Sequence, residues 1–206
     1  MTTTRQANSQ SAAPLRWRTV DLITTVMIGV VFGVIFIGWG SLTNLTSPLF
    51  LALPPLSGLL GGFWWLPAVV AALVIRRPGA ALLAELVAAS VEPLLGGQWG
   101  LATLVSGVLQ GVGVELGFLL LAYRRFTLVP AILGGAIAGL LETPYEWFAY
   151  FPEWVAGWAV LYAVTMGISG AIIAGVGGYA LTKALARTGV LAPFPIGRVH
   201  AESRQV

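Results

Sequence analysis

Two carboxylates, Glu85 and Glu92, stand seven residues apart in the apolar run LLAELVAASVEPLLGGQWG at residues 82–100. Seven steps of about 100° return nearly to the same side of a helix, so the spacing predicts that both side chains share one face. An ionisable side chain near the middle of a bilayer costs roughly 2.5–3.5 kcal/mol on insertion scales. Two of them on one face therefore indicate a functional site. Protonated carboxyls bonded to neighbouring helices are the structural alternative.

Position along the predicted helices separates the acidic side chains by depth. Glu85 lies nine residues beyond Arg76, and Glu115 lies nine residues before Arg124. The helical rise therefore predicts that both carboxylates lie about 13 Å from the arginines, near the midplane. By the same rise, Glu92 lies about 10 Å further out than Glu85, close to the outer mouth.

The loops and helix ends opposite the arginines are acidic and aromatic. Carboxylates and rings together suit a cationic or amine-bearing aromatic ligand, through hydrogen bonds, stacking and cation–π contacts. An interfacial aromatic belt is the alternative explanation for the tryptophans and tyrosines. The polar and aromatic residues in these segments are Trp39, Asn44, Glu92, Gln98, Trp99, Glu142, Tyr145, Glu146, Trp147, Tyr150, Glu153, Trp154 and Trp158.

The composition identifies the kind of protein that must position these residues. Of 206 residues, 57% are hydrophobic and 9% are charged, and the mean hydropathy is +0.87. A soluble domain is usually about a quarter charged, so this is an integral membrane protein. The absence of cysteine from the sequence excludes disulfides and thiolate chemistry. The net charge of +3 does not indicate nucleic-acid binding, because the basic residues mark one side of the membrane.

Six apolar segments have spanning length, and they predict an all-α membrane protein. All 11 basic residues fall on one side of this six-helix arrangement, which places both termini in the cytoplasm and opens the ligand site to the outside. We expect a disordered cytoplasmic tail at 1–15, a six-helix transmembrane domain at 16–187 and a cytoplasmic tail at 188–206. The segments are Val20–Trp39, Leu56–Ile75, Gly79–Leu95, Leu101–Tyr123, Leu128–Trp147 and Val155–Leu185.

Glycines four residues apart predict close helix packing. The fourth segment carries two such pairs, Gly107 with Gly111 and Gly113 with Gly117, and packing within the chain is the favoured interpretation there. The first segment carries Gly29 and Gly33. This stripe could equally dock another membrane subunit.

Several chemistries are disfavoured by missing residues. GISG, residues 167–170, matches the GxSG serine motif of rhomboid intramembrane proteases, but the only histidine, His200, lies beyond the last segment. Ser169 is therefore interpreted as a packing residue. There is no phosphate-binding P-loop and the only lysine is Lys183, so energy for uphill transport must come from elsewhere. Nothing in the spacing indicates a metal site or a cofactor.

The motifs VEPLLGGQWG (91–100), GVLQGVGVEL (107–116) and WRTVD (17–21) before a first helix bearing GVVFG resemble the YkoE family. These are substrate-binding S components of energy-coupling factor (ECF) transporters. The resemblance covers residues 16 to 185. It implies a six-helix subunit of a bacterial plasma membrane that captures thiamine or its hydroxymethylpyrimidine precursor from outside. A transmembrane coupling subunit and two cytoplasmic ATPases would complete the importer. By motif, the ligand-site candidates are Glu92, Gln98, Trp99, Gln110 and Glu115, and the small-residue face of the first helix would be the coupling face.

Taken together, these patterns favour a substrate-capture subunit rather than an enzyme. Trp99, Trp39 or Tyr145 would stack on the ligand ring, carboxylates would accept its N–H groups, and residues 41–50 would close as a lid. The candidate ligand-binding residues are Glu92, Trp99, Gln98, Glu115, Gln110, Glu85, Trp39, Asn44, Glu142, Tyr145 and Glu146, and the candidate docking residues are Gly29 and Gly33.

Three other functions remain open. The first is a stand-alone organic-cation carrier that uses Glu85 and Glu115 as a proton relay. The second is a rhomboid-like protease. The third is a ligand-free assembly subunit.

Overall fold

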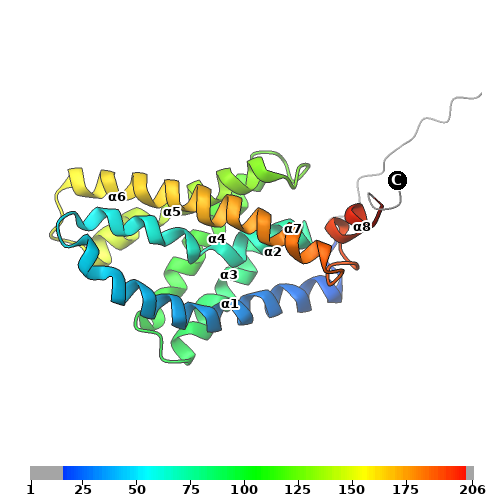
Figure 1. The fold of residues 1–206 in the computed structure, drawn as a ribbon, viewed down its shortest axis with the longest axis horizontal. Coiled ribbons are helices and arrows are strands. Elements are labelled where there is room, and N and C mark those ends of the chain that lie inside the picture. The colour runs from blue at the N-terminus through cyan, green and yellow to red at the C-terminus, as the bar shows by residue number, and fades with distance from the viewer. Residues whose placement is uncertain (1–15, 203–206) are drawn as a thin grey trace, which may run out of the picture.

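The computed structural model describes residues 16–202, and it describes side chains as far as residue 198. Every regular element in this range is helical, which confirms the all-α class for the described residues (Figure 1). The predicted disordered tail at 1–15 and the final residues 203–206 lie outside the described residues. The elements are α1 (Thr19–Thr46), η1 (Ser47–Phe50), η2 (Pro54–Phe63), α2 (Leu66–Ile75), α3 (Ala80–Leu94), η3 (Gly100–Ala102), α4 (Thr103–Leu119), α5 (Leu128–Tyr150), α6 (Ala156–Ser169), η4 (Gly170–Gly177), α7 (Gly178–Arg187) and α8 (Pro195–Glu202).

Five helical stretches in the described range are long and apolar enough to cross a membrane. They are Thr19–Phe50, Pro54–Ile75, Gly100–Leu119, Leu128–Tyr150 and Ala156–Arg187. The remaining predicted segment corresponds to α3, which has 15 residues. A helix of that length spans about 22 Å, less than the usual hydrocarbon thickness. Six crossings and their orientation therefore stay predictions.

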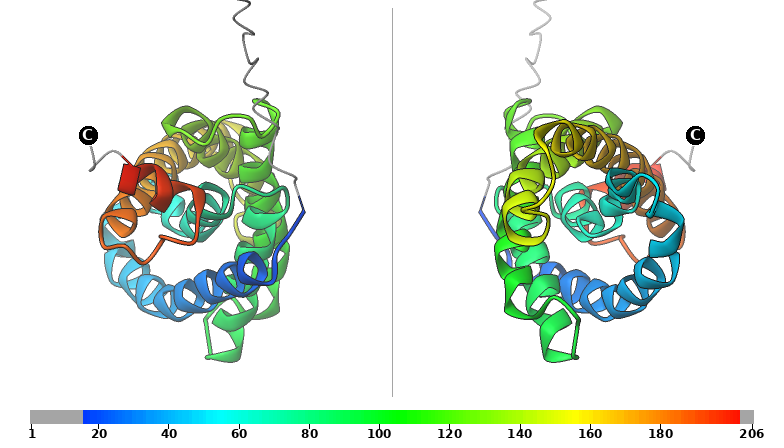
Figure 2. Two further views of the ribbon diagram at one scale, coloured as in Figure 1. Left: turned by 90° about the vertical axis from the view of Figure 1, so that its right-hand side faces the viewer. Right: turned by 90° about the vertical axis from the view of Figure 1, so that its left-hand side faces the viewer.

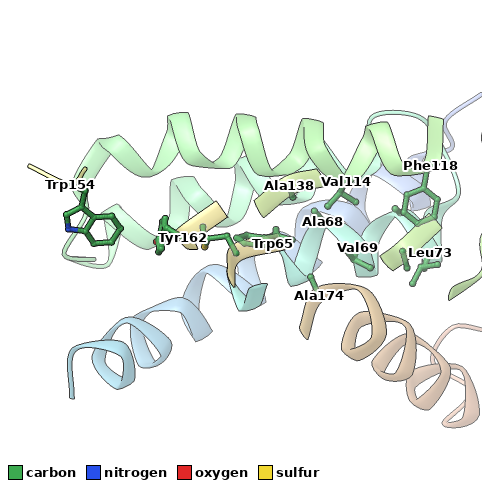
Figure 3. Packing of buried hydrophobic residues seen from close by; sticks show 14 residues of the cluster. Trp65, Ala68, Val69, Leu73, Val114, Phe118, Ala138, Trp154, Tyr162 and Ala174 are labelled. Carbon is green, nitrogen blue, oxygen red and sulfur yellow. The ribbon is translucent and has the colours of Figure 1, made fainter. Parts of the chain in front are cut away.

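Helix α2 lies at the centre of the bundle. All ten of its residues are buried, which explains its continuous apolar sequence LPAVVAALVI without a polar face. The other helices surround it as a ring (Figure 2). The main apolar cluster runs along the bundle from Trp154 past Trp65 to Phe118 and Leu73 (Figure 3).

The paired glycines pack within the chain. A Cβ added at Gly29 or Gly33 would lie 2.6 Å from the Cβ atoms of Val87 or Val91, respectively, on α3. Both glycines are buried, so the expectation that they dock a partner subunit is wrong: α3 already occupies their face of α1. On α4, the two predicted pairs serve two neighbours. Gly107 and Gly111 face α3, and Gly113 and Gly117 face α5.

The second candidate span, Pro54–Ile75, changes from the 3₁₀ helix η2 to the α-helix α2 partway along its length. A 3₁₀ helix turns every three residues, and its buried residues Pro55, Gly58 and Gly61 follow that period. Ser169 joins this segment to α6, because its hydroxyl donates to Leu59 O at 2.6 Å and accepts from Gly62 N–H at 2.9 Å. Ser169 is therefore a buried packing residue, and the GISG motif has a structural explanation.

One end of the bundle, here called the basic end, carries the arginines that join the helices. Asp21 is buried there, and it accepts hydrogen bonds from Arg18 and pairs with Arg77 at 3.7 Å. The side-chain hydrogen bond with Asp21 raises the pKa of the Arg18 guanidinium. The opposite end, here called the cavity end, contains the α1–η2 and α3–α4 connections and the start of α6.

The C-terminal segment is more ordered than a simple tail. Leu191 and Phe194 are buried in a cluster with Val74, Ile75 and Ala80, and the helix α8 follows. Arg18 lies 6.0 Å from the centre of the Phe194 ring, a cation–π distance. The predicted tail boundary at residue 188 therefore falls inside the folded domain.

Candidate ligand-binding site

Three adjoining cavities open within the cavity end of the bundle. The central cavity has a volume of about 70 Å³, the wide cavity about 290 Å³ and the side cavity about 120 Å³. Trp64, Trp99, Glu146 and Tyr150 line both the central and the wide cavity. The residues around the central cavity are Phe36, Trp64, Glu85, Ala89, Glu92, Trp99, Thr103, Ser106, Gln110, Glu146 and Tyr150.

Glu85 is positioned by the start of α2, where the second candidate span changes from 3₁₀ helix to α-helix. It projects from α3 and accepts a hydrogen bond from the backbone N–H of Ala68, in the first turn of α2. Backbone N–H groups in a first turn have no partner inside the helix, and the helix dipole favours a carboxylate there. The second oxygen, Oε2, is buried and makes no hydrogen bond. Glu85 therefore lines the central cavity with one oxygen held and the other without a partner.

Glu142 lies behind the cavity wall. It is fully buried on α5, and neither of its carboxylate oxygens makes a hydrogen bond of standard geometry. Its carboxylate interacts with the side chains of Ser106 and Gln110, which line the central cavity, whereas Glu142 itself does not. A donor that enters the cavity would thus meet Gln110 and Ser106 first.

Glu146 stands one helical turn further along α5, where the central and wide cavities meet. The Tyr162 hydroxyl, from α6, donates to its Oε2 at 2.5 Å. Tyr162 itself packs edge-on against Phe151 and Trp154, with ring centroids 5.7 and 5.3 Å away. The aromatic cluster thus fixes the direction of the Glu146 carboxylate.

Aromatic rings form the walls of the cavities. Trp99 lies 5.2 Å from the Tyr150 ring and Trp64 lies 4.9 Å from the Phe36 ring, measured between centroids. The four rings come from four separate segments of the chain: Phe36 from α1, Tyr150 from α5, and Trp64 and Trp99 from two different turns. Rings above three carboxylates form a site that can bind an aromatic ligand carrying positive charge or N–H donors.

The α3–α4 connection closes one side of the site. It contains Gly96 and Gly100 at φ values of 85° and 57°, which a residue with a side chain rarely adopts. It projects beyond the ring of helices (Figure 2). The Asn44 amide of α1 donates to Gln98 Oε1, which joins this connection to the end of α1.

Comparison with known proteins identifies the family to which this architecture belongs. The model of a family described as "ABC-type cobalt transport system, permease component" matches residues 20–141. The HMP/thiamine permease protein YkoE of Bacillus subtilis (strain 168) is 32% identical over 192 residues, which cover 92% of this chain and 94% of that protein. A crystal structure described as an S-component of an ECF transporter matches with a TM-score of 0.85 and 31% identity, over 92% of this chain and 96% of that one.

The chain belongs to the YkoE family of ECF-transporter S components. It is thus a membrane transport protein, and its relatives are transporter subunits rather than enzymes. An S component implies a small-molecule substrate and an ECF module as partner. No cluster of three or more histidine, cysteine, aspartate or glutamate side chains that could hold a metal ion occurs in the described part of the chain.

The structure brings together seven of the eleven residues predicted for the ligand site of this YkoE-family protein. Glu85, Glu92, Trp99, Gln110 and Glu146 line the central cavity. Gln98 lines the side cavity, and Asn44 lines both the side and the wide cavity. One small cavity thus touches both Glu85 and Glu92, whose spacing predicts a shared helical face.

Glu115 has a different environment. Its Oε1 accepts from the backbone N–H groups of Ala81 and Leu82, at 2.8 and 3.4 Å, and its Oε2 accepts from the Tyr123 hydroxyl. Burial, together with this hydrogen bond, raises the pKa of Tyr123, which stays a proton donor. Glu115 thus caps the N-terminus of α3 at the basic end and lines none of the three cavities.

The equal depth predicted for Glu85 and Glu115 is wrong by about one helical turn. Gly111, four residues before Glu115, is the residue of α4 that lies beside Glu85. The estimate failed because residues 76–79 form a turn rather than helix, and α4 ends at Leu119.

The other three predicted residues, Trp39, Tyr145 and Glu142, lie beside the cavities. Trp39 stacks on Phe63 with centroids 4.2 Å apart. The Tyr145 hydroxyl donates to Ala102 O at 3.3 Å, which attaches α5 to the α3–α4 connection. Residues 41–50 also differ from a free lid, because α1 continues to Thr46 and η1 follows directly.

Sequence reasoning missed Trp64 and Tyr162. Trp64 contributes to both the central and the wide cavity, and Tyr162 orients Glu146. A signal for Trp64 was present in the motif GGFWWLP, where glycines and a proline flank two tryptophans in the middle of a crossing. Tyr162 had no such signal, because one tyrosine in an apolar helix is indistinguishable from a packing residue.

Proposed function

We propose that this protein is the substrate-capture subunit of an ECF-type importer in a bacterial plasma membrane, and that it binds thiamine or hydroxymethylpyrimidine from outside. The observation that carries the proposal is that Glu85, whose buried Oε2 has no hydrogen-bond partner, lines a cavity walled by tryptophan and tyrosine. A buried acceptor without a partner costs about 1–3 kcal/mol, which a ligand N–H group would recover. The name of the relative YkoE supports the choice of ligand.

We expect the two rings of thiamine to occupy different cavities, one the central cavity and the other the wide cavity. The central cavity offers Glu85, Glu92 and Gln110 as partners for the amino group and ring nitrogens of an aminopyrimidine. The wide cavity has room for the thiazolium ring of thiamine, beside Glu146, Trp99 and Tyr150. A cation held near a carboxylate and over aromatic rings is stabilised by both contacts.

Orientation and partners complete the proposal. Six crossings with both termini inside place the cavity end at the outer surface, because the basic end carries the cytoplasmic arginines. A transmembrane coupling subunit and two ATPases would drive release. Since Gly29 and Gly33 are buried, the coupling subunit would contact the opposite face of α1, where Ile23, Met27 and Val31 are exposed.

Calorimetric titration of the purified protein with thiamine tests the site. Glu92→Gln and Trp99→Ala should each weaken thiamine binding by about tenfold or more, since each removes one charge-assisted or stacking contact. Glu153→Gln, which changes a carboxylate in the α5–α6 connection, is the matched control and should bind thiamine normally. Unchanged affinity in both site variants would contradict the assignment.

Uptake into vesicles tests the division of labour. Vesicles that contain only this chain should not accumulate thiamine, whereas addition of the coupling subunit, the ATPases and ATP should restore uptake. Accumulation by the chain alone would instead indicate a stand-alone carrier. The structure gives that alternative little support, because Glu115 caps α3 and does not face Glu85 across the cavity.

A further inference from the structure

The carboxyl groups that line the three cavities have no basic side chain beside them in the lining. Their linings contain three carboxylates, Glu85, Glu92 and Glu146, and no lysine, arginine or histidine. Every lysine and arginine that the structure describes, from Arg16 to Arg198, belongs to a segment at the basic end of the bundle. A ligand that carries a phosphate would therefore meet carboxylates without any cationic side chain to offset them.

The backbone around the side cavity offers a phosphate little compensation. Phosphate sites usually form where successive backbone N–H groups point into one space. Here the N–H of Gly96 donates to Pro93 O at 3.1 Å, and the N–H of Gly97 donates to Glu92 O at 3.0 Å. These donors are directed back into the α3–α4 connection.

Two side-chain donors of the same cavity are engaged as well. The Asn44 amide donates to Gln98 Oε1, and the Ser41 hydroxyl donates to Ile37 O at 2.9 Å. Both residues line the side cavity. Hydrogen bonding from the Asn44 amide to a phosphate would compete with the contact that joins α1 to the α3–α4 connection, and hydrogen bonding from Ser41 would compete with a bond inside α1.

Glu92 is the carboxylate that lines both adjoining cavities. It is buried, and it lines the central and the side cavity together with Phe36. Gly97 packs closely enough that an added Cβ would lie 2.6 Å from Glu92 Cγ, so the connection holds the side chain in place. A substituent that extends from the central into the side cavity passes this carboxylate.

We propose that Glu92 is a specificity-determining residue that rejects anionic substituents, so that the protein binds the free vitamin and excludes its phosphate esters. This inference rests on the proposed thiamine site and adds the chemical form of the ligand. Like charges brought together at a binding interface cost several kcal/mol. We therefore expect thiamine monophosphate to bind at least about 30-fold more weakly than thiamine.

Calorimetric titration of the full-length wild-type protein with three ligands is the first test. Thiamine, thiamine monophosphate and O-acetylthiamine are compared at low and physiological salt. The acetyl ester adds bulk at the same oxygen without charge, so it should bind within a few-fold of thiamine. Monophosphate binding within threefold of thiamine would overturn the inference, and so would an equal loss for the acetyl ester, which would make the rejection steric.

Glu92→Gln is the second test, because it removes the charge and nearly preserves the shape. The ratio of monophosphate to thiamine dissociation constants should fall by about tenfold in this variant. Glu146→Gln provides a second measurement of the same ratio if Glu92→Gln does not fold, and Glu153→Gln should leave the ratio unchanged. An unchanged ratio in Glu92→Gln would overturn the assigned role. Absence of any thiamine binding by the wild-type protein would instead overturn the proposed function, and this inference with it.

Discussion

Both ends of the bundle contain buried or half-buried carboxylates, but these differ in their hydrogen-bond partners. At the basic end, Asp21 pairs with Arg18 and Arg77, and Glu115 accepts hydrogen bonds from two backbone N–H groups and from Tyr123. At the cavity end, Glu85 keeps one oxygen without a partner and Glu142 keeps two. Asp21 and Glu115, with their partners, serve the fold, whereas Glu85 lines the central cavity with one oxygen that has no partner. Glu142 lines none of the three cavities.

Two helical glycines, one toward each end, differ strongly in packing. Near the basic end, backbones meet directly, and a Cβ added at Gly117 would lie 2.2 Å from the backbone nitrogen of Gly134. At the cavity end, Gly157 has no neighbouring atom within 4 Å of an added Cβ. A methyl group added at Gly117 would therefore meet backbone, whereas one added at Gly157 would meet open space.

The largest expected effect is on binding at the cavity end. Glu85→Gln should weaken thiamine binding by about 100-fold, because a hydrogen bond to a charged acceptor contributes about 1.5–3 kcal/mol. Stability of the ligand-free protein should not fall, since the amide oxygen can still accept from the Ala68 N–H. Titration calorimetry and ligand-free thermal unfolding measure the two quantities. Normal thiamine binding by this variant would remove the distinction between the two ends.

The next effect is on stability near the basic end. Gly117→Ala should destabilise the protein by about 2 kcal/mol, because the new methyl group meets backbone that cannot move aside. Gly157→Ala is the matched control and should be neutral or slightly stabilising, as alanine favours helix. Unfolding in detergent measured for both variants tests this pair. Equal stability of the two would show that the packing contrast has no energetic weight.

The smallest expected effect follows from removal of the Glu115 carboxylate, which should lower stability without changing ligand affinity. Glu115→Ala should lower the free energy of unfolding by about 0.5–2 kcal/mol, as expected for loss of a helix cap. Thiamine affinity should stay within about twofold, because Glu115 lines none of the cavities and the expected loss is confined to the cap. A large loss of affinity with unchanged stability would return Glu115 to the ligand site.

Much of the fold was predictable because spans depend on local composition. An apolar segment of about 20 residues must satisfy its backbone internally, so helices follow from the sequence alone. Helix ends were less predictable. The first helix was expected to end at Trp39 and continues to Thr46, because its polar sequence SLTNLT still finds partners at Gln98 and in its own last turns.

The candidate site was predictable in part for the same reason. Glu85 and Glu92 share a face because helical spacing is regular, and the central cavity contains both. Glu115 could not be separated from them by counting residues, since the turn after Arg76 and the end of α4 change its level. Tyr162 became visible only through its contact with Glu146 on another helix.

The sequence by itself determined the membrane class, the helical segments, the basic end and the family, because hydropathy, charge placement and motifs are local properties of the chain. Only the tertiary structure decided which carboxylates have partners. Hydrogen-bond donors to Glu115 come from α3, and the donor to Glu85 comes from the start of α2. Whether a carboxylate supports the fold or is left for a ligand to bind depends on which helix end packs against it. The packing of the whole bundle determines this contact.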